Sequence, residues 1–354
     1  MKKRKRKISK NQIGVKQRSG DKIFSFWRLG IFILVAVIIS VGYLLRRPQG
    51  TVTENFRYGV AFSRIFSEQL GLDWRENYLA ILKDLDPEFL RLPVYWQDIE
   101  KSKGEFDFAD YDWMINEAER SSTQLVLVIG RKTPRWPECN LPDWAKQIPE
   151  EEQKARVLNQ LEKIVQKYKN QSNLYAWQVE NEPFLQFGDC KLMGGDFLDK
   201  EIALVRELDG NRHPIMVTDS GELSLWLPAA KRADIFGTTM YRIVHSPRFG
   251  YIEYPLPPRF FWLKANLVHL FYPNRPIIIS ELQTEPWGPR LIYDISIDEQ
   301  MKTMTLDHFK DNINYAKVVG FPDIYLWGAE WWYWMEKKHS RPEYWQEAKQ
   351  LFKS

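Results

Sequence analysis

The chain has 354 residues, of which 44% are hydrophobic and 14% aromatic, so it is neither disordered nor too short for a large core. The net charge of +4 conceals two parts of opposite sign. Residues 1–47 hold 13 Lys or Arg and one acidic residue, which leaves 37 basic and 45 acidic residues in the rest. The larger part is acidic, and the charge therefore predicts no nucleic-acid partner.

The N-terminal segment has the pattern of a membrane anchor. Met1–Arg28 carries eleven Lys or Arg, and Leu29–Leu45 is a run of 17 residues without a charge. That length is near the lower limit for crossing a bilayer, and the aromatic residues just before the run can extend it into the interface. A cleaved signal peptide shares the pattern, but the end of the run has no small residues in an Ala-x-Ala arrangement.

We therefore predict a basic cytoplasmic tail at residues 1–23, a transmembrane signal anchor at residues 24–45 and a linker at residues 46–56. Since the positive charge precedes the span, the N-terminus would lie in the cytoplasm. The chain would then be a single-pass plasma-membrane protein with its main domain outside the cytoplasm.

Beyond the linker, short apolar runs alternate with amphipathic stretches. Eight runs have the length and residue types of buried strands; they lie near Tyr58–Phe62, Phe89–Pro93, Gln124–Ile129, Leu174–Val179, Pro214–Thr218, Ile235–Met240, Pro276–Ser280 and Ile324–Trp327. Amphipathic helices are predicted at Glu150–Lys169, Asp199–Leu208 and Asp298–Val318. Eight β/α units predict an α/β fold, a single (β/α)8 TIM barrel over residues 57–354.

Two glutamates stand where predicted strands end. Glu182 follows the fourth strand, and Glu281 follows the seventh. The carboxyl ends of parallel barrel strands form the rim where ligands bind, and two facing carboxylates can cleave a glycosidic bond. Each glutamate alone could instead be a buried ion-pair partner.

The residues around the first glutamate, Asn181-Glu182-Pro183, match a strand-four motif of known enzymes. With Glu281 at strand seven, the pattern resembles the retaining glycoside hydrolases of clan A, which include the cellulase-like family 5. The resemblance implies that Glu182 is the acid/base, that Asn181 contacts the sugar 2-hydroxyl and that Glu281 is the nucleophile.

Further positions match the same clan. Arg91 at the second strand and Tyr241 at the sixth stand where the clan carries hydrogen-bond donors to the nucleophile, and Trp327 at the eighth stands where a tryptophan lies under the sugar. The match departs at one point, because no histidine accompanies Asn181 or Tyr241 as it does in several family 5 enzymes.

Retaining cleavage needs the two carboxyl groups in opposite states, one ionised to attack the anomeric carbon and one protonated to release the leaving group. Arg91 and Tyr241 would hold Glu281 ionised, because a cation and hydrogen-bond donors stabilise a carboxylate. Glu182 lacks such partners in the matched motif and faces a negative neighbour, so it would keep its proton.

Some of the 15 tryptophans are candidates for stacking on sugar rings. An exposed aromatic face is unfavourable unless something covers it, so those on strand-end loops are the better candidates; these are Trp96, Trp136, Trp287, Trp331 and Trp332. The others are expected in the core.

Cys139 and Cys190 follow the third and fourth strands, so both belong to neighbouring loops on the same face of the barrel. In an oxidising compartment they could form a disulfide that fastens these loops. Two free buried thiols are the alternative.

The five histidines show no metal-ligand spacing, and no glycine-rich phosphate loop is present, so we predict neither a metal nor a cofactor. The predicted function is hydrolysis of a β-linked oligo- or polysaccharide with retention. A barrel that binds glycans without cleaving them and a transglycosylase acting on cell-surface polysaccharide are the alternatives.

Overall fold

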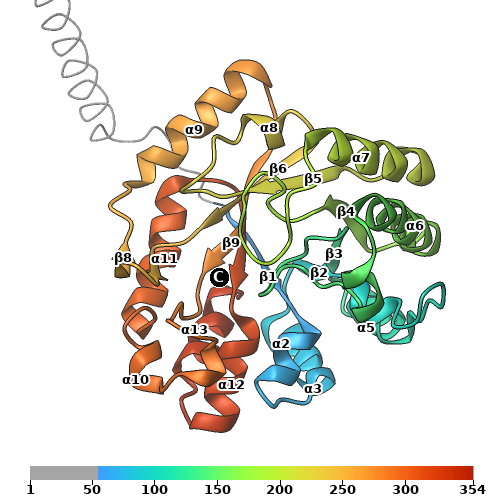
Figure 1. Ribbon diagram of the computed structural model, residues 1–354. Helices are drawn as coiled ribbons and strands as arrows, with labels where there is room; N and C mark the ends of the chain where they lie inside the picture. Colours follow the sequence, from blue (N-terminus) through green and yellow to red (C-terminus); the bar gives the residue numbers. More distant parts are fainter. Residues whose placement is uncertain (1–54, 354) are drawn as a thin grey trace, which may run out of the picture. The chain divides into compact units, whose positions relative to one another are not determined.

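The computed structural model describes residues 55–353, and eight parallel strands form a closed barrel inside a ring of helices (Figure 1). In barrel order the strands are β1 (Arg57–Ala61), β10 (Asp323–Trp327), β9 (Ile277–Gln283), β6 (Ile235–Met240), β5 (Ile215–Asp219), β4 (Leu174–Val179), β3 (Gln124–Ile129) and β2 (Phe89–Pro93). Each of these strands was predicted from an apolar run, and the TIM-barrel prediction is confirmed.

Helices surround the barrel (Figure 1). They are α2 (Arg64–Gln69), α3 (Trp74–Ala80), α4 (Trp96–Ile99), α5 (Ala109–Arg120), α6 (Glu150–Tyr168), α7 (Gly195–Asp209), α8 (Leu227–Ala230), α9 (Pro258–Phe271), α10 (Ile297–Gln300), α11 (Leu306–Val319), α12 (Ala329–His339) and α13 (Glu343–Leu351). A π-helical turn lies at Ile81–Leu85, and short 3-10 helices lie at Asp143–Gln147 and Ile292–Asp294. In α6, for example, Val157, Leu161 and Ile164 are fully buried, which is the spacing of one helix face.

Two features differ from the prediction. The helix expected over Asp298–Val318 is two helices, α10 and α11, because the Thr305 hydroxyl accepts the His308 backbone N–H at 3.1 Å and so starts a new helix. An antiparallel hairpin of β7 (Ile243–Ser246) and β8 (Gly250–Glu253) follows β6 and was not predicted.

The barrel interior changes from apolar to polar along its axis. An apolar layer fills its lower part, made by Phe89, Val126, Ala176, Met216, Ile235, Ile278 and Tyr325. Side chains two residues further along a strand point to the same side. The next interior layer therefore contains Arg91 above Phe89, Gln178 above Ala176 and Thr218 above Met216, so the carboxyl ends of the strands surround a polar site.

Among residues 55–353, no helix is both long and apolar enough to cross a bilayer. The predicted transmembrane segment at residues 24–45 lies outside the described residues, as does the predicted tail before it.

Candidate active site

Arg91 organises the polar layer at the carboxyl end of the barrel. Its guanidinium, fully buried, donates to Gln178 Oε1 at 2.7 Å, to Glu281 Oε1 at 2.6 Å and to Asn181 Oδ1 at 2.8 Å. A buried cation is tolerated only when it is paired and hydrogen-bonded, and here three different residues meet that need. Arg91 thus joins β2, β4 and β9 at one point.

Glu281 lies in β9, two residues before the strand ends, and its carboxylate faces a cleft. Arg91 donates to one carboxylate oxygen, and the Tyr241 hydroxyl donates to the other at 2.9 Å. An ionised carboxylate only accepts hydrogen bonds, so both donors suit the charged form. The residues expected from the sequence to surround Glu281 are brought together here.

Glu182 follows β4 in a left-handed backbone conformation, with φ of 42°. Its N–H donates to Thr218 Oγ1 at 3.1 Å, and its carboxyl Oε1 accepts the Thr239 hydroxyl at 3.1 Å. Thr239 also pairs with Glu281 in the β6–β9 ladder, which places the two glutamates on the same part of the rim.

The pKa of Glu182 is raised well above its usual value. Burial is the largest cause, followed by the negative charges of Glu138 and Glu281, while the Lys132 ammonium opposes the shift. Its surroundings therefore favour the protonated form of Glu182, whereas Glu281 is bound by the Arg91 guanidinium. The two carboxyl groups at this rim thus differ in the charge of their neighbours, which is positive beside Glu281 and mainly negative beside Glu182.

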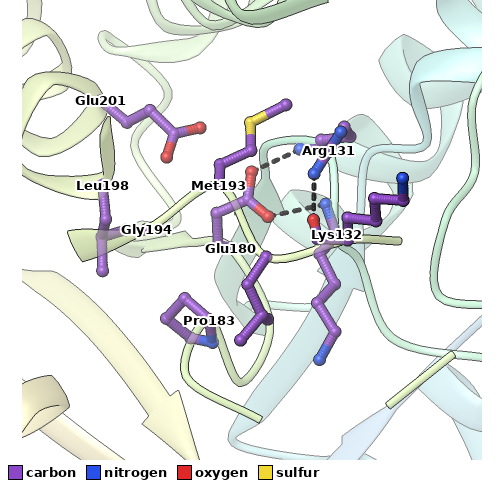
Figure 2. A pocket seen from close by; sticks show the side chains of 10 residues that line it. Arg131, Lys132, Glu180, Pro183, Met193, Gly194, Leu198 and Glu201 are labelled. Carbon is purple, nitrogen blue, oxygen red and sulfur yellow. Dashed lines mark hydrogen bonds between the residues drawn. The ribbon is translucent and has the colours of Figure 1, made fainter. Parts of the chain in front are cut away.

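The loop after β3 is fastened by Glu180, which precedes the Asn181-Glu182 pair. Its two carboxylate oxygens accept the backbone N–H groups of Arg131 and Lys132 at 2.6 and 2.7 Å, as Figure 2 shows. A Cβ at Gly130 would collide with this carboxylate, so the close approach requires glycine.

A cavity of about 20 Å³ lies beside this clamp, about the room that one water molecule needs. Glu201 lines it from α7 and lies across it from Glu180 (Figure 2). Burial, and then the charge of Glu180, raise the pKa of Glu201 well above its usual value, which favours its protonated form.

The main cleft has a volume of about 530 Å³ and opens above Glu281. Trp327 lies in it with 7% of its surface exposed, and Trp136 and Trp287 line it as well. Trp136, Phe187, Trp287 and Tyr241 form a series of neighbouring rings with centroid distances of 5.9, 5.7 and 5.2 Å. Trp136 is half exposed, so its face is free to contact a ligand.

Other tryptophans expected on the rim lie in the core. Trp96 is 1% exposed, donates to Glu100 Oε2 at 2.6 Å and packs edge-on against Trp144. Trp331 and Trp332 are fully buried in α12. The expectation that these three residues stack on sugars is corrected, because α4 and α12 begin shortly after β2 and β10 and bury these aromatic side chains.

A disulfide joins Cys139 to Cys190, with a Cα–Cα distance of 4.8 Å. It links the loops after β3 and β4, as expected for the paired form. These loops carry Trp136 and Phe187, so the disulfide fastens one wall of the cleft.

Sequence reasoning missed two charged groups of the cleft. Glu138, next to Cys139, pairs with Lys132 at 2.9 Å. Arg135 binds Glu285 and, at 3.0 Å, Glu330, and its guanidinium lies 4.0 Å from the centre of the Trp327 ring. Both Glu138 and Arg135 belong to the irregular loop after β3, where no periodicity indicates the direction of a side chain.

In the part of the chain that the structure describes, no group of three or more His, Cys, Asp or Glu is arranged to hold a metal ion.

Comparison with known proteins points to one group of enzymes. Residues 93–213 match the model of glycosyl hydrolase family 10, a range that includes Glu182. The chain resembles the glycoside hydrolases of clan A. This confirms the clan-level resemblance, and the family model that matches is that of family 10 and not of the cellulase-like family 5.

Endo-1,4-beta-xylanase 3 of Hypocrea jecorina is 26% identical over 147 residues, which are 39% of this chain and 40% of the xylanase. The match thus spans less than half of that relative. Among solved structures of the clan A fold, a Gloeophyllum trabeum endo-beta-1,4-xylanase has a TM-score of 0.52 at 14% identity, covering 80% of this chain and 86% of its own. A beta-galactosidase from Bacillus circulans sp. alkalophilus has a TM-score of 0.54 at 11% identity, over 77% and 50%. These two likenesses concern the fold.

Proposed function

We propose that this protein is a retaining β-glycosidase, with Glu281 as nucleophile and Glu182 as acid/base. The observation that carries the proposal is the contrast between the two carboxyl groups. Arg91 and Tyr241 donate hydrogen bonds to the Glu281 carboxylate, while burial and negative neighbours raise the pKa of Glu182 and so favour its protonated form. Double displacement needs this combination of one ionised and one protonated carboxyl group.

In the first step, a Glu281 oxygen attacks the anomeric carbon while Glu182 gives its proton to the glycosidic oxygen, and the aglycone leaves. Tyr241 keeps its proton and its hydrogen bond. In the second step, the Glu182 carboxylate takes a proton from water, and the resulting hydroxide displaces Glu281 from the sugar. Glu182 is then protonated again, so the cycle closes.

Trp327 and Asn181 are proposed to contact the sugar undergoing cleavage, and Trp136 and Trp287 to hold the neighbouring part of the substrate. The substrate class is a β-linked glycan, and the similarity to xylanases puts xylan first among the candidates. A barrel that only binds glycans would have no need of the paired carboxyl states around Arg91.

The test is to incubate the full-length protein in detergent with xylan, β-glucans, mannan and a set of aryl β-glycosides, and to follow the anomer of the first product by NMR. We expect the β-anomer to appear first. Release of the α-anomer would indicate inversion, and tight binding without product would support the binding barrel. Products longer than the substrate would indicate transglycosylation.

We further propose that residues 24–45 anchor the protein in the plasma membrane, with residues 57–354 outside the cytoplasm. The support is the basic leader followed by an uncharged run. The protein should stay with membranes after salt and alkaline washes, since screening releases proteins held only by charge. A mature soluble form starting near Arg47 would instead show that the segment is a cleaved signal peptide.

A further inference from the structure

Glu138 is a third carboxyl group in the main cleft. It lies on the loop between β3 and α6 and is 7% exposed. Its Oε2 forms an ion pair with Lys132 Nζ at 2.9 Å, and its Oε1 accepts a hydrogen bond from Asn181 Nδ2 at 3.3 Å. Asn181 directly precedes Glu182, so Glu138 is connected to the region of the proposed acid/base.

The loop is shaped to bring this side chain into the cleft. Glu138 has a φ of 60°, in the left-handed region that is unfavourable for residues other than glycine. Its carbonyl accepts the Thr133 N–H at 3.0 Å, and the next residue is tied to Cys190 by the disulfide. A Cβ at Gly188 would collide with the Pro137 carbonyl, so a second loop packs closely against the first.

The charges of this region are distributed unevenly. The groups that face Glu138 and Glu182 are Lys132 at the start of the loop after β3, Arg91 from β2, Glu281 from β9, Asp219 from β5 and Tyr241 after β6. Arg91 binds Glu281, and Lys132 pairs with Glu138. Within residues 55–353, Glu182 forms no ion pair, so no cation in direct contact with its carboxyl group offsets its burial.

Lys132 connects the two regions, because its ammonium also donates to the Glu182 backbone carbonyl at 3.1 Å. The bond goes to the carbonyl and not to the carboxyl. Lys132 therefore holds the backbone of Glu182 in place while its ammonium forms an ion pair with Glu138.

We propose that Glu138 is a positioning residue whose negative charge keeps the proton on Glu182 before bond cleavage and makes Glu182 a stronger base in the water step. Glu138 neither gives nor takes a proton during the cycle, so the reaction balance is unchanged. This inference rests on the proposed glycosidase function.

The pKa shifts of Glu182 and Glu138 agree with this geometry. After burial, the charge of Glu138 is the largest cause of the raised pKa of Glu182. Burial also raises the pKa of Glu138 to about 7, with Lys132 opposing. Glu138 is therefore neutral in acid and charged in alkali, and its effect on Glu182 is confined to the alkaline side.

The experiment compares the pH dependence of kcat/KM in the full-length protein and in Glu138→Gln, on an aryl β-glycoside whose leaving group needs protonation. The alkaline limb, set by Glu182, should move down by about one pH unit, since a like charge at this range shifts a pKa by that order. The acid limb should stay, because Glu138 is already neutral there. Glu138→Asp, which keeps the charge, should restore most of the alkaline limb.

Asp189→Asn is the matched control, because it removes an exposed charge beside the same disulfide. This variant should leave the acid limb and the alkaline limb of the kcat/KM pH profile unchanged. A dinitrophenyl glycoside, whose release needs no proton, should show no downward shift with Glu138→Gln in the glycosylation step.

Equal loss across the whole pH range in Glu138→Gln, or an unmoved alkaline limb, would overturn the proposal. Rescue of that variant by azide would also overturn it, because Glu138 would then be the proton donor itself. If the wild-type protein cleaves no glycoside, the glycosidase function fails, and the carboxyl titration decides the inference separately.

For that titration, full-length wild-type protein labelled with ¹³C at glutamate carboxyl carbons is followed by NMR against pH. Assignment uses Glu182→Gln and Glu138→Gln. The Glu182 signal should show a second inflection where Glu138 ionises. Independent single-step titrations would refute the coupling even if the Glu138→Gln variant failed to fold.

Discussion

The rim above β9 and the rim above β4 show how one residue type acquires two different electrostatic surroundings. Glu281 receives a buried guanidinium and a phenol, one on each oxygen. Glu182 receives a neutral hydroxyl from Thr239 and lies near the negative charges of Glu138 and Glu281. The difference comes from the neighbours and not from burial, since both side chains are about equally buried.

The strongest test of this contrast is Glu281→Ala. Loss of the proposed nucleophile should reduce kcat/KM by at least about 10⁴-fold for every leaving group. Azide, if it reacts at all, should give the α-glycosyl azide by direct attack from the vacated face. Glu253→Ala, which removes an exposed glutamate of β8, should keep full activity, and a β-azide from the Glu281 variant would reverse the assignment.

Glu182→Ala should behave differently. Rates should fall by about 10²–10⁴-fold for leaving groups that need protonation. A dinitrophenyl glycoside should still form the glycosyl-enzyme and then stall, because the base for the water step is missing. Azide should restore turnover with the β-glycosyl azide as product, measured by NMR, and absence of rescue would leave Glu182 without its proposed role.

Arg91→Met should affect stability as well as activity. Removing one partner of a buried ion pair leaves Glu281 as an uncompensated charge, which costs about 3–5 kcal/mol in the free energy of unfolding. Denaturant unfolding of the variant measures the loss. Arg75→Met, which breaks an ion pair with Asp110 between half-exposed side chains, should cost much less, and similar losses in both would contradict the importance of the buried site.

Tyr241→Phe should have the smallest effect. It keeps the edge-on contact with Trp287 and removes one hydrogen bond to a charged group, so kcat/KM should fall about ten- to a hundredfold. Tyr325→Phe removes a hydroxyl from the apolar interior layer and should leave kcat/KM unchanged. An unaffected Tyr241→Phe variant would show that Arg91 alone orients Glu281.

The barrel could be predicted from the sequence because each strand is a continuous apolar run. One face of such a strand is buried in the barrel interior and the other is buried against the helices. The error at α10 and α11 arose because apolar spacing continues across the Thr305 cap, and a cap is a local hydrogen bond that periodicity does not record. The β7–β8 hairpin was missed because its residues are only partly buried and carry little alternation.

The tryptophans show the limit of sequence reasoning at the site. Trp96 and Trp136 both follow a predicted strand closely, yet one is 1% and the other 50% exposed. Their surroundings depend on whether a short helix or an open loop follows the strand. Sequence position near the rim therefore identified candidates without separating core residues from cleft residues.

The sequence by itself predicted the strands and the two glutamates at the rim, because apolar runs mark the strands and their ends mark the rim, and the resemblance to clan A pointed to the partners Arg91 and Tyr241. Only the tertiary structure showed that Glu138 and Lys132 contribute to the electrostatics of Glu182. Glu138 and Lys132 reach it from a loop some fifty residues earlier in the chain, and their effect depends on a left-handed backbone residue, a packed glycine and burial that exist only in the folded barrel.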